Sequence, residues 1–446
     1  MVDRLILHIG ATKTGTSAIQ SALARNRATL LANGILYPVN KEVDDKAKAG
    51  RVTGGNGALF RSLYNKYPDS PQRALRKFEA DLRHLASDDK ANALLFSHER
   101  GGGVEPELLS ELKAIFSRYF DRVQVIYYVR HLTDHAISQY GEYVKRRGMK
   151  AAFNAFAPKY RARFKRTIET YESVFGRDDI EYVLYDDVRR KLFRDFLQRV
   201  GLPSSIDYQE PERVNRSLTA DEIEVLRHVN HMGLARTLVA RIVENFTFEN
   251  KNPKQRPMPI SRADIETIEA SNRDVLECVN VRLSGGAVLR AASDGIMRDA
   301  SDMEQSATPG LDPQIMAGLL ASGLRVTERR NGKLDPHIVG AVRQAEAGLR
   351  DVEQRQDTTN PKLMLSLLEA GLRAINSRHA EPTKPVREGK MRKRDILKAA
   401  ESGETDPKAA DLLAQKRQRR IERKKQKASG KEVSESPEQK RQRRIE

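Results

Sequence analysis

The first 200 residues alternate between short apolar runs and stretches with helical spacing, and this alternation limits the chain to few folds. The apolar runs are typical of buried strands and cover 5–9, 93–96, 123–129 and 180–185. Helical spacing is found between them, over 17–32, 105–118, 132–147, 158–175 and 188–200. Strands that alternate with helices form crossover units. The sequence therefore predicts an α/β fold: a P-loop-like parallel sheet with helices on both faces.

The strand signal fades beyond residue 205, where a helical C-terminal region is expected. Two helices are predicted over 219–245 and 261–280, separated by the Pro- and Asn-rich break "NKNPKQRPMP". Three similar segments then begin at Asp312, Asp335 and Asn360. Each has a capping residue, a proline at the first helical position and a final Gly-Leu-Arg. They predict either a small three-helix bundle or three unrelated helices with the same start signal.

The end of the chain is a basic, low-complexity tail. The chain has 79 Lys and Arg against 61 Asp and Glu, a net charge of +18, and residues 384–446 hold 21 of these cations and 11 of these carboxylates. The octapeptide "QKRQRRIE" occurs there twice, at 415–422 and 439–446. With so few apolar residues, the tail is expected to be disordered or a solvated helix. Its charge could contact a polyanion or a membrane surface.

A glycine-rich loop follows the first predicted strand in "HIGATKTGTSAIQ". Gly10 and Gly15 have the spacing of the ATPase motif G-x-x-x-x-G-K-[ST], but Thr16 replaces its lysine and Lys13 lies inside the loop. A strand–loop–helix unit directs backbone amides and the positive end of a helix dipole at one point, which favours an anion. Lys13 adds a charge, and hydroxyls come from Thr14, Thr16 and Ser17. The alternative is a tight turn without a ligand.

A second group of polar residues follows the third predicted strand. In "YYVRHLTDHAISQYGEYVKRRG", Arg130 stands at the strand end and Ser138 lies two turns into the next helix. Ligands of open α/β sheets bind at the carboxyl ends of strands. Arg130 and the glycine loop could therefore face one crevice and hold two phosphate groups of one nucleotide.

Together, "KTGTSAIQ" after one strand and Arg-x7-Ser after a later one resemble the family of sulfotransferases that use 3′-phosphoadenosine 5′-phosphosulfate (PAPS). The Lys-Thr-Gly-Thr form is most similar to carbohydrate-type and bacterial sulfotransferases, as are "NGILYP" and "VNRSLTADEIEVLRHVN". The resemblance covers about 1–245. It implies that Lys13, Thr14, Gly15, Thr16 and Ser17 hold the 5′-phosphosulfate and that Arg130 and Ser138 hold the 3′-phosphate. It also implies a carbohydrate-like acceptor and a transfer reaction that requires no metal.

Two parts of the family pattern are not fixed by the sequence. The Arg-Lys-Gly-x-x-Gly segment of the cytosolic branch is absent, and Arg213, Asn215 and Arg216 are candidates to replace it. The catalytic base is open among His98 and Glu99, which follow the second strand, and Glu42, which lies beyond the loop. Glu99 could equally be a structural partner of an arginine.

The organisation predicted is a catalytic domain over 1–245, a helical extension and linker over 246–310, a three-helix accessory region over 311–380 and the tail over 381–446. One cysteine, Cys278, fits a reducing compartment, and no apolar run is long enough to span a membrane, so a cytoplasmic location is expected. Two other functions stay open. One is a nucleotide kinase or NTPase with a deviant loop; the other is a polyanion-binding protein that acts through its tail.

Overall fold

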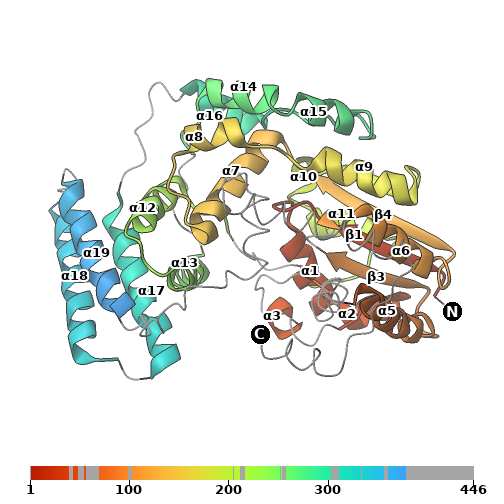
Figure 1. Ribbon diagram of the computed structural model, residues 1–446, viewed down its shortest axis with the longest axis horizontal. Coiled ribbons are helices and arrows are strands. Elements are labelled where there is room, and N and C mark those ends of the chain that lie inside the picture. Colours follow the sequence, from red (N-terminus) through yellow and green to blue (C-terminus); the bar gives the residue numbers. More distant parts are fainter. Residues whose placement is uncertain are drawn as a thin grey trace, which may run out of the picture. The chain divides into compact units, whose positions relative to one another are not determined.

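A five-stranded parallel sheet lies at the centre of the N-terminal half (Figure 1). The computed structural model describes residues 2–39, 44–48, 55–56, 70–98, 103–203, 205–210, 216–251, 253, 258–302, 311–332, 334–355 and 360–377. The strands are β1 (Arg4–Ile9), β2 (Ile35–Leu36), β3 (Ala93–His98), β4 (Arg122–Val129) and β5 (Ile180–Leu184), in the order β2-β3-β1-β4-β5. The predicted α/β class is confirmed. Only the two-residue β2 was not predicted.

Helices cover both faces of this sheet, as expected. Side chains of β1 alternate between the faces, so Leu5 and Ile9 join one apolar cluster and Ile6 joins another. The Ile6 face is covered by α1 (Thr16–Arg25) and α11 (Leu192–Arg199). The Leu5 face is covered by α5 (Pro71–Ala86), α6 (Pro106–Phe116), α7 (Leu132–Glu142) and α9 (Phe164–Phe175). Both faces are buried, which accounts for the continuous apolar runs in the sequence.

The neighbouring strands β1 and β4 are followed by helices on opposite faces. These strands pair in parallel, with Leu5 beside Val123 and Leu7 beside Val125. The chain leaves β1 toward α1 on one face and leaves β4 toward α7 on the other. The two connections therefore diverge at the carboxyl edge, which is where open α/β sheets form a ligand crevice.

The remaining helices divide the predicted helical segments more finely. They are α2 (Arg27–Ala32), α3 (Asp44–Lys48), α8 (Phe153–Phe156), α10 (Tyr185–Val188), α12 (Ala220–His231), α13 (Arg236–Glu249), α14 (Arg262–Ala270), α15 (Arg273–Asn280) and α16 (Asp294–Asp302), with a π-helical turn at Tyr143–Arg147 and a 3₁₀ turn at Ala157–Lys159. The single helix predicted over 219–245 is two helices, because Gly233 adopts a φ of 71° that a continuing helix does not allow.

The three segments that begin with a capping residue and proline form α17 (Pro313–Asn331), α18 (Pro336–Gln354) and α19 (Pro361–Ser377), which pack on one another (Figure 1). The predicted starts are confirmed. The carboxylate of Asp312 accepts the amide of Gln314 at 2.8 Å, and that of Asp335 accepts the amide of His337 at 2.9 Å. In each Gly-Leu-Arg the glycine lies against a neighbouring helix: an added Cβ at Gly371 would be 2.6 Å from Leu320.

All described residues belong to one compact unit, Met1–His379. One apolar cluster runs from Leu5 of β1 to Ile375 of α19, and α17 contacts α13 where Gly318 leaves room for Phe246. The finer division at 245 and 310 stays a prediction. The second unit, Ala380–Glu446, lies outside the described residues, so the expectation for the tail does too. No helix in the described part of the chain combines the length and apolar character needed to cross a bilayer.

Candidate anion-binding site

The loop at residues 10–15 has a conformation that specifies both of its glycines. An added Cβ at Gly10 would lie 2.1 Å from the Thr16 hydroxyl oxygen, and one at Gly15 would lie 2.3 Å from Leu192. Gly15 also has a φ of 75°. Lys13 has a φ of 69°, the only positive φ of a non-glycine residue in the described part of the chain. A side chain in this region costs about 1–2 kcal/mol, so the loop stores strain at its one lysine.

The start of α1 is open toward the loop. Its first turn has no acidic residue, and no side chain caps it. Such a start leaves backbone amides without helical partners, at the positive end of the helix dipole. The buried Thr14 hydroxyl donates to the carbonyl of Ala11 at 2.7 Å and so fixes the turn. The buried Thr16 hydroxyl has no hydrogen-bond partner among the described residues, and Ser17 is half-buried beside it.

Arg130, directly after β4, reaches the loop. Its guanidinium donates to the carbonyl oxygen of Lys13 at 3.1 Å and lies over the ring of Tyr185. Its Nε is 3.7 Å from the Asp186 carboxylate, which accepts the amide of His131 at 2.8 Å. Burial raises the pKa of Asp186 above its usual value, although the His131 amide and Arg130 act in the opposite direction. The two anchors predicted from the sequence therefore meet at the carboxyl edge of β1 and β4.

The Lys13 side chain forms an ion pair with α7. Its ammonium is 2.9 Å from one carboxylate oxygen of Glu142, and the other oxygen is 2.7 Å from Nε of Arg146. The Lys13 and Glu142 side chains are 27% and 31% exposed, so water and a ligand can reach the pair. Burial raises the pKa of Glu142, but Lys13 and Arg146 outweigh it, and the net pKa is lowered. The carboxylate is thus ionised at neutral pH.

A buried histidine on α7 contacts the glycine loop at Thr12. His135 on α7 has Nε2 3.4 Å from the Thr12 hydroxyl and Nδ1 2.7 Å from the hydroxyl of Tyr160. Burial, aided by the nearby Arg130 charge, lowers the pKa of His135 to about 3. It is therefore neutral at physiological pH and acts as a hydrogen-bonding support for the loop.

The other predicted site residues have different positions. Ser138 is half-buried on α7, one turn before Glu142. His98 is the half-buried last residue of β3 and pairs in register with Ile9, at the edge where the loop begins. Glu99 and Glu42, the other two candidate bases, lie outside the described residues.

Arg216 lies in a separate ion pair. Its guanidinium makes two hydrogen bonds of 2.6 Å to the carboxylate of Glu222 and also contacts the carbonyl of Asn250. The two side chains are 6% and 1% exposed. Glu222 in turn accepts the amide of Thr219 at the start of α12. The structure therefore uses Arg216 to fix the start of α12 and does not bring it to the loop. Arg213 and Asn215 lie outside the described residues.

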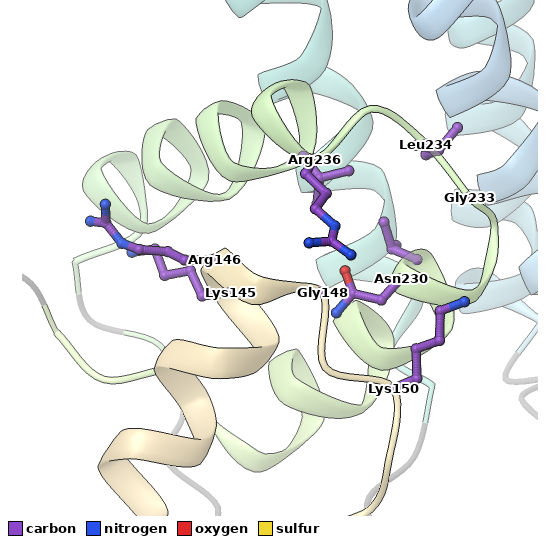
Figure 2. A pocket seen from close by; sticks show the side chains of 10 residues that line it. Lys145, Arg146, Gly148, Lys150, Asn230, Gly233, Leu234 and Arg236 are labelled. Carbon is purple, nitrogen blue, oxygen red and sulfur yellow. The ribbon is translucent and has the colours of Figure 1, made fainter. Parts of the chain in front are cut away.

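A pocket of about 200 Å³ lies beyond the π-helical turn, between this turn and the corner of α12 and α13. Its lining includes Asn230 and Arg236, and no residue of the loop. Figure 2 shows the side chains of Lys145 and Arg146 extending away from these two residues. Both of these cations also line the pocket, and Arg146 pairs with Glu142 as well, so this arginine lies between the pocket and the ion pair at the loop.

Sequence reasoning missed Glu142 as a partner of Lys13. A signal was available, because Glu142 lies four residues after Ser138 and such residues share one face of a helix. No group of three or more His, Cys, Asp or Glu side chains suited to a metal ion occurs within the residues described above.

Comparison with known proteins gives limited information. No protein-family model and no curated protein matches the chain. A solved sulfotransferase from Alicyclobacillus acidocaldarius is similar, with 16% sequence identity over 60% of this chain and 95% of that one. The TM-score is 0.29, so this likeness adds no weight to the assignment of function.

Proposed function

We propose that the protein transfers a sulfuryl group from PAPS to a hydroxyl or amine of an acceptor, for which a carbohydrate is the predicted class. The observation that carries this proposal is the 3.1 Å contact between the Arg130 guanidinium and the carbonyl of Lys13. It joins a cation at the end of β4 to an anion-binding loop at the end of β1. A nucleotide with phosphate groups at both its 3′ and 5′ positions needs two such anchors.

In this proposal the loop holds the 5′-phosphosulfate, with contributions from Lys13, Thr14, Gly15, Thr16 and Ser17. The open amides of α1 supply donors that need no rearrangement, whereas the unpartnered Thr16 hydroxyl is buried and would have to turn toward the ligand. Arg130 and Ser138 take the 3′-phosphate. Arg216 would have to leave Glu222 to contribute, which is costly for a buried pair.

The chemistry is a single displacement at sulfur. A lone pair of the acceptor oxygen or nitrogen forms the new bond to sulfur, and the bond from sulfur to the bridging oxygen of the 5′-phosphate breaks. That electron pair stays on the phosphate, where Lys13 and the loop amides stabilise the added charge. The acceptor proton passes to a base, for which His98, Glu99 and Glu42 are the candidates.

Two features favour sulfuryl transfer over a kinase or NTPase activity. Thr16 occupies the position of the lysine that contacts the outer phosphates in ATP-binding loops. The sequence offers the Asp186-Asp187 pair after an apolar strand as the candidate magnesium ligands, and of these Asp186 already accepts the His131 amide and faces Arg130. A magnesium ion there would compete with the positive charge of Arg130.

Calorimetry with adenosine-3′,5′-bisphosphate and AMP tests the proposal. We expect the bisphosphate to bind at least about tenfold more tightly, because a charge-assisted contact exists only with the 3′-phosphate. Arg130→Ala should remove this preference. Arg122→Ala is the matched control, since Arg122 is exposed at the opposite end of the same strand. Equal affinity for both nucleotides in the unaltered protein, or magnesium-dependent ATP hydrolysis, contradicts the proposal.

The carbohydrate nature of the acceptor, recruitment of a polyanion by the tail and a cytoplasmic location stay predictions. The sequence features that suggest them are the Lys-Thr-Gly-Thr form, the duplicated "QKRQRRIE" and the single Cys278.

A further inference from the structure

The charges around the loop nearly cancel. Lys13, Arg130 and Arg146 supply three positive charges, and Glu142 and Asp186 oppose them. With both carboxylates ionised, these five side chains sum to +1 beside the open start of α1, and Lys145, whose charge also acts on Lys13 and Glu142, raises the sum to +2. A site for a highly charged polyphosphate needs a larger excess of positive charge.

Glu142 has the greatest influence on this balance, because it is paired directly with the loop lysine. Its Oε2 is 2.9 Å from the Lys13 ammonium, so any anion that Lys13 contacts also comes close to this carboxylate. The carboxylate cannot easily turn away, since its Oε1 is held by Arg146 at 2.7 Å. Because the pair is only partly exposed, water screens the repulsion incompletely.

The terminal groups of PAPS and of nucleoside diphosphates differ in charge and hardly in shape. A terminal sulfuryl group carries one negative charge, whereas a terminal phosphoryl group carries nearly two at neutral pH because its second pKa is about 6. A fixed carboxylate beside the terminal group therefore repels phosphoryl more strongly than sulfuryl. Such repulsion against a wrong ligand is a common source of specificity.

We propose that Glu142 is a specificity-determining residue that makes the loop select a singly charged sulfuryl terminus over a doubly charged phosphoryl terminus. This inference rests on the proposed function, because it assumes that the loop holds the transferred group. It adds the discrimination between two nucleotides of equal size, which the loop donors alone would bind alike.

Adenosine 5′-phosphosulfate and ADP are the probes, since they differ in the terminal sulfur or phosphorus atom and its charge. Calorimetry is done with EDTA, so that no metal neutralises the ADP. We expect the unaltered protein to bind adenosine 5′-phosphosulfate at least about tenfold more tightly than ADP. Glu142→Gln should reduce the ratio to about threefold or less, mainly through tighter binding of ADP. Glu142→Asp keeps the charge and should keep most of the preference.

Glu244→Gln is the matched control. Glu244 is an exposed carboxylate on α13 that interacts electrostatically with Lys145, and it does not form the ion pair that joins Lys13 to α7. This variant should retain the ratio of the unaltered protein. A ratio that is unchanged in Glu142→Gln, while adenosine-3′,5′-bisphosphate still binds, overturns the role of Glu142 alone. Failure of all three nucleotides to bind the unaltered protein overturns the proposed function as well.

Discussion

Replacing Lys13 by glycine and by alanine separates the backbone strain of the loop from the chemistry of its lysine. Both changes remove the ammonium and its 2.9 Å pair with Glu142. They differ in the backbone, because only glycine adopts a φ of 69° without cost. We therefore expect both variants to be inactive and the glycine variant to be the more stable of the two.

The expected difference follows from two opposing terms. A side chain in the left-handed region costs about 1–2 kcal/mol, and glycine removes this cost. Glycine also gives the unfolded chain more freedom, which lowers the free energy of unfolding by about 0.4–1 kcal/mol. The net advantage of Lys13→Gly over Lys13→Ala is about 1 kcal/mol. The lost ion pair contributes only about 0.5 kcal/mol because it is partly exposed, and this loss is the same in both variants.

Urea denaturation followed by far-ultraviolet circular dichroism measures this difference, since the chain has no tryptophan. Sulfuryl transfer should fall at least about a hundredfold in both variants, as for loss of one donor placed for the transition state. If Lys13→Ala is as stable as Lys13→Gly, the backbone at position 13 is not in the left-handed conformation. If either variant keeps near-normal turnover, Lys13 does not stabilise the leaving group.

Three further predictions concern stability and the tail. Burial lowers the pKa of both His8 and His135 to about 3, so only the unfolded chain takes up protons at these histidines as the pH falls below about 6.5. By pH 5 each histidine should lower the free energy of unfolding by about 2 kcal/mol, and urea curves at pH 7 and 5 that coincide would contradict this. Gly371→Ala should lower the unfolding free energy by about 1–3 kcal/mol because its Cβ would be 2.6 Å from Leu320, whereas the control Gly340→Ala, on an open face of α18, should be neutral or stabilising in the same urea assay. Removal of 379–446 should leave the urea midpoint and the turnover of a small acceptor unchanged. If the tail recruits a polyanion, the KM of the truncated protein for that polymer should depend less on salt than the KM of the full chain, and identical salt profiles would refute recruitment.

The sheet and the repeated helices could be predicted because local sequence and tertiary environment agree there. The strands are buried on both faces, so they read as continuous apolar runs, and α17 and α18 start at an aspartate and proline that also cap them. The boundary at Gly233 could not be placed, because the apolar spacing continues across the break. Nor could β2, whose two residues are too few to show a pattern.

The glycine loop and Arg130 could be predicted from the sequence, but the carboxylates that pair with them, Glu142 and Asp186, could not. Arg130 follows a clear strand, so its place at the carboxyl edge could be inferred. Its contact with Asp186 depends on the parallel pairing of β4 with β5, which no local pattern shows. Arg216 illustrates the opposite case. A motif that resembles a family suggested a ligand contact, but the guanidinium is nearly buried against Glu222 at the start of α12.

The packing of Thr16 explains why the lysine of this loop is not in the position that ATP-binding loops use. Thr16 is 2% exposed, and its hydroxyl occupies the space beside Gly10 where even a Cβ would not fit. A lysine at position 16 would have to leave this contact or bury its charge, and both are costly. Lys13 avoids this cost because the left-handed turn directs its side chain toward α7, where Glu142 provides a counter-ion. The displaced lysine, the strained backbone and the carboxylate on α7 are thus parts of one arrangement, and a change to any of them should alter the anion that the loop accepts.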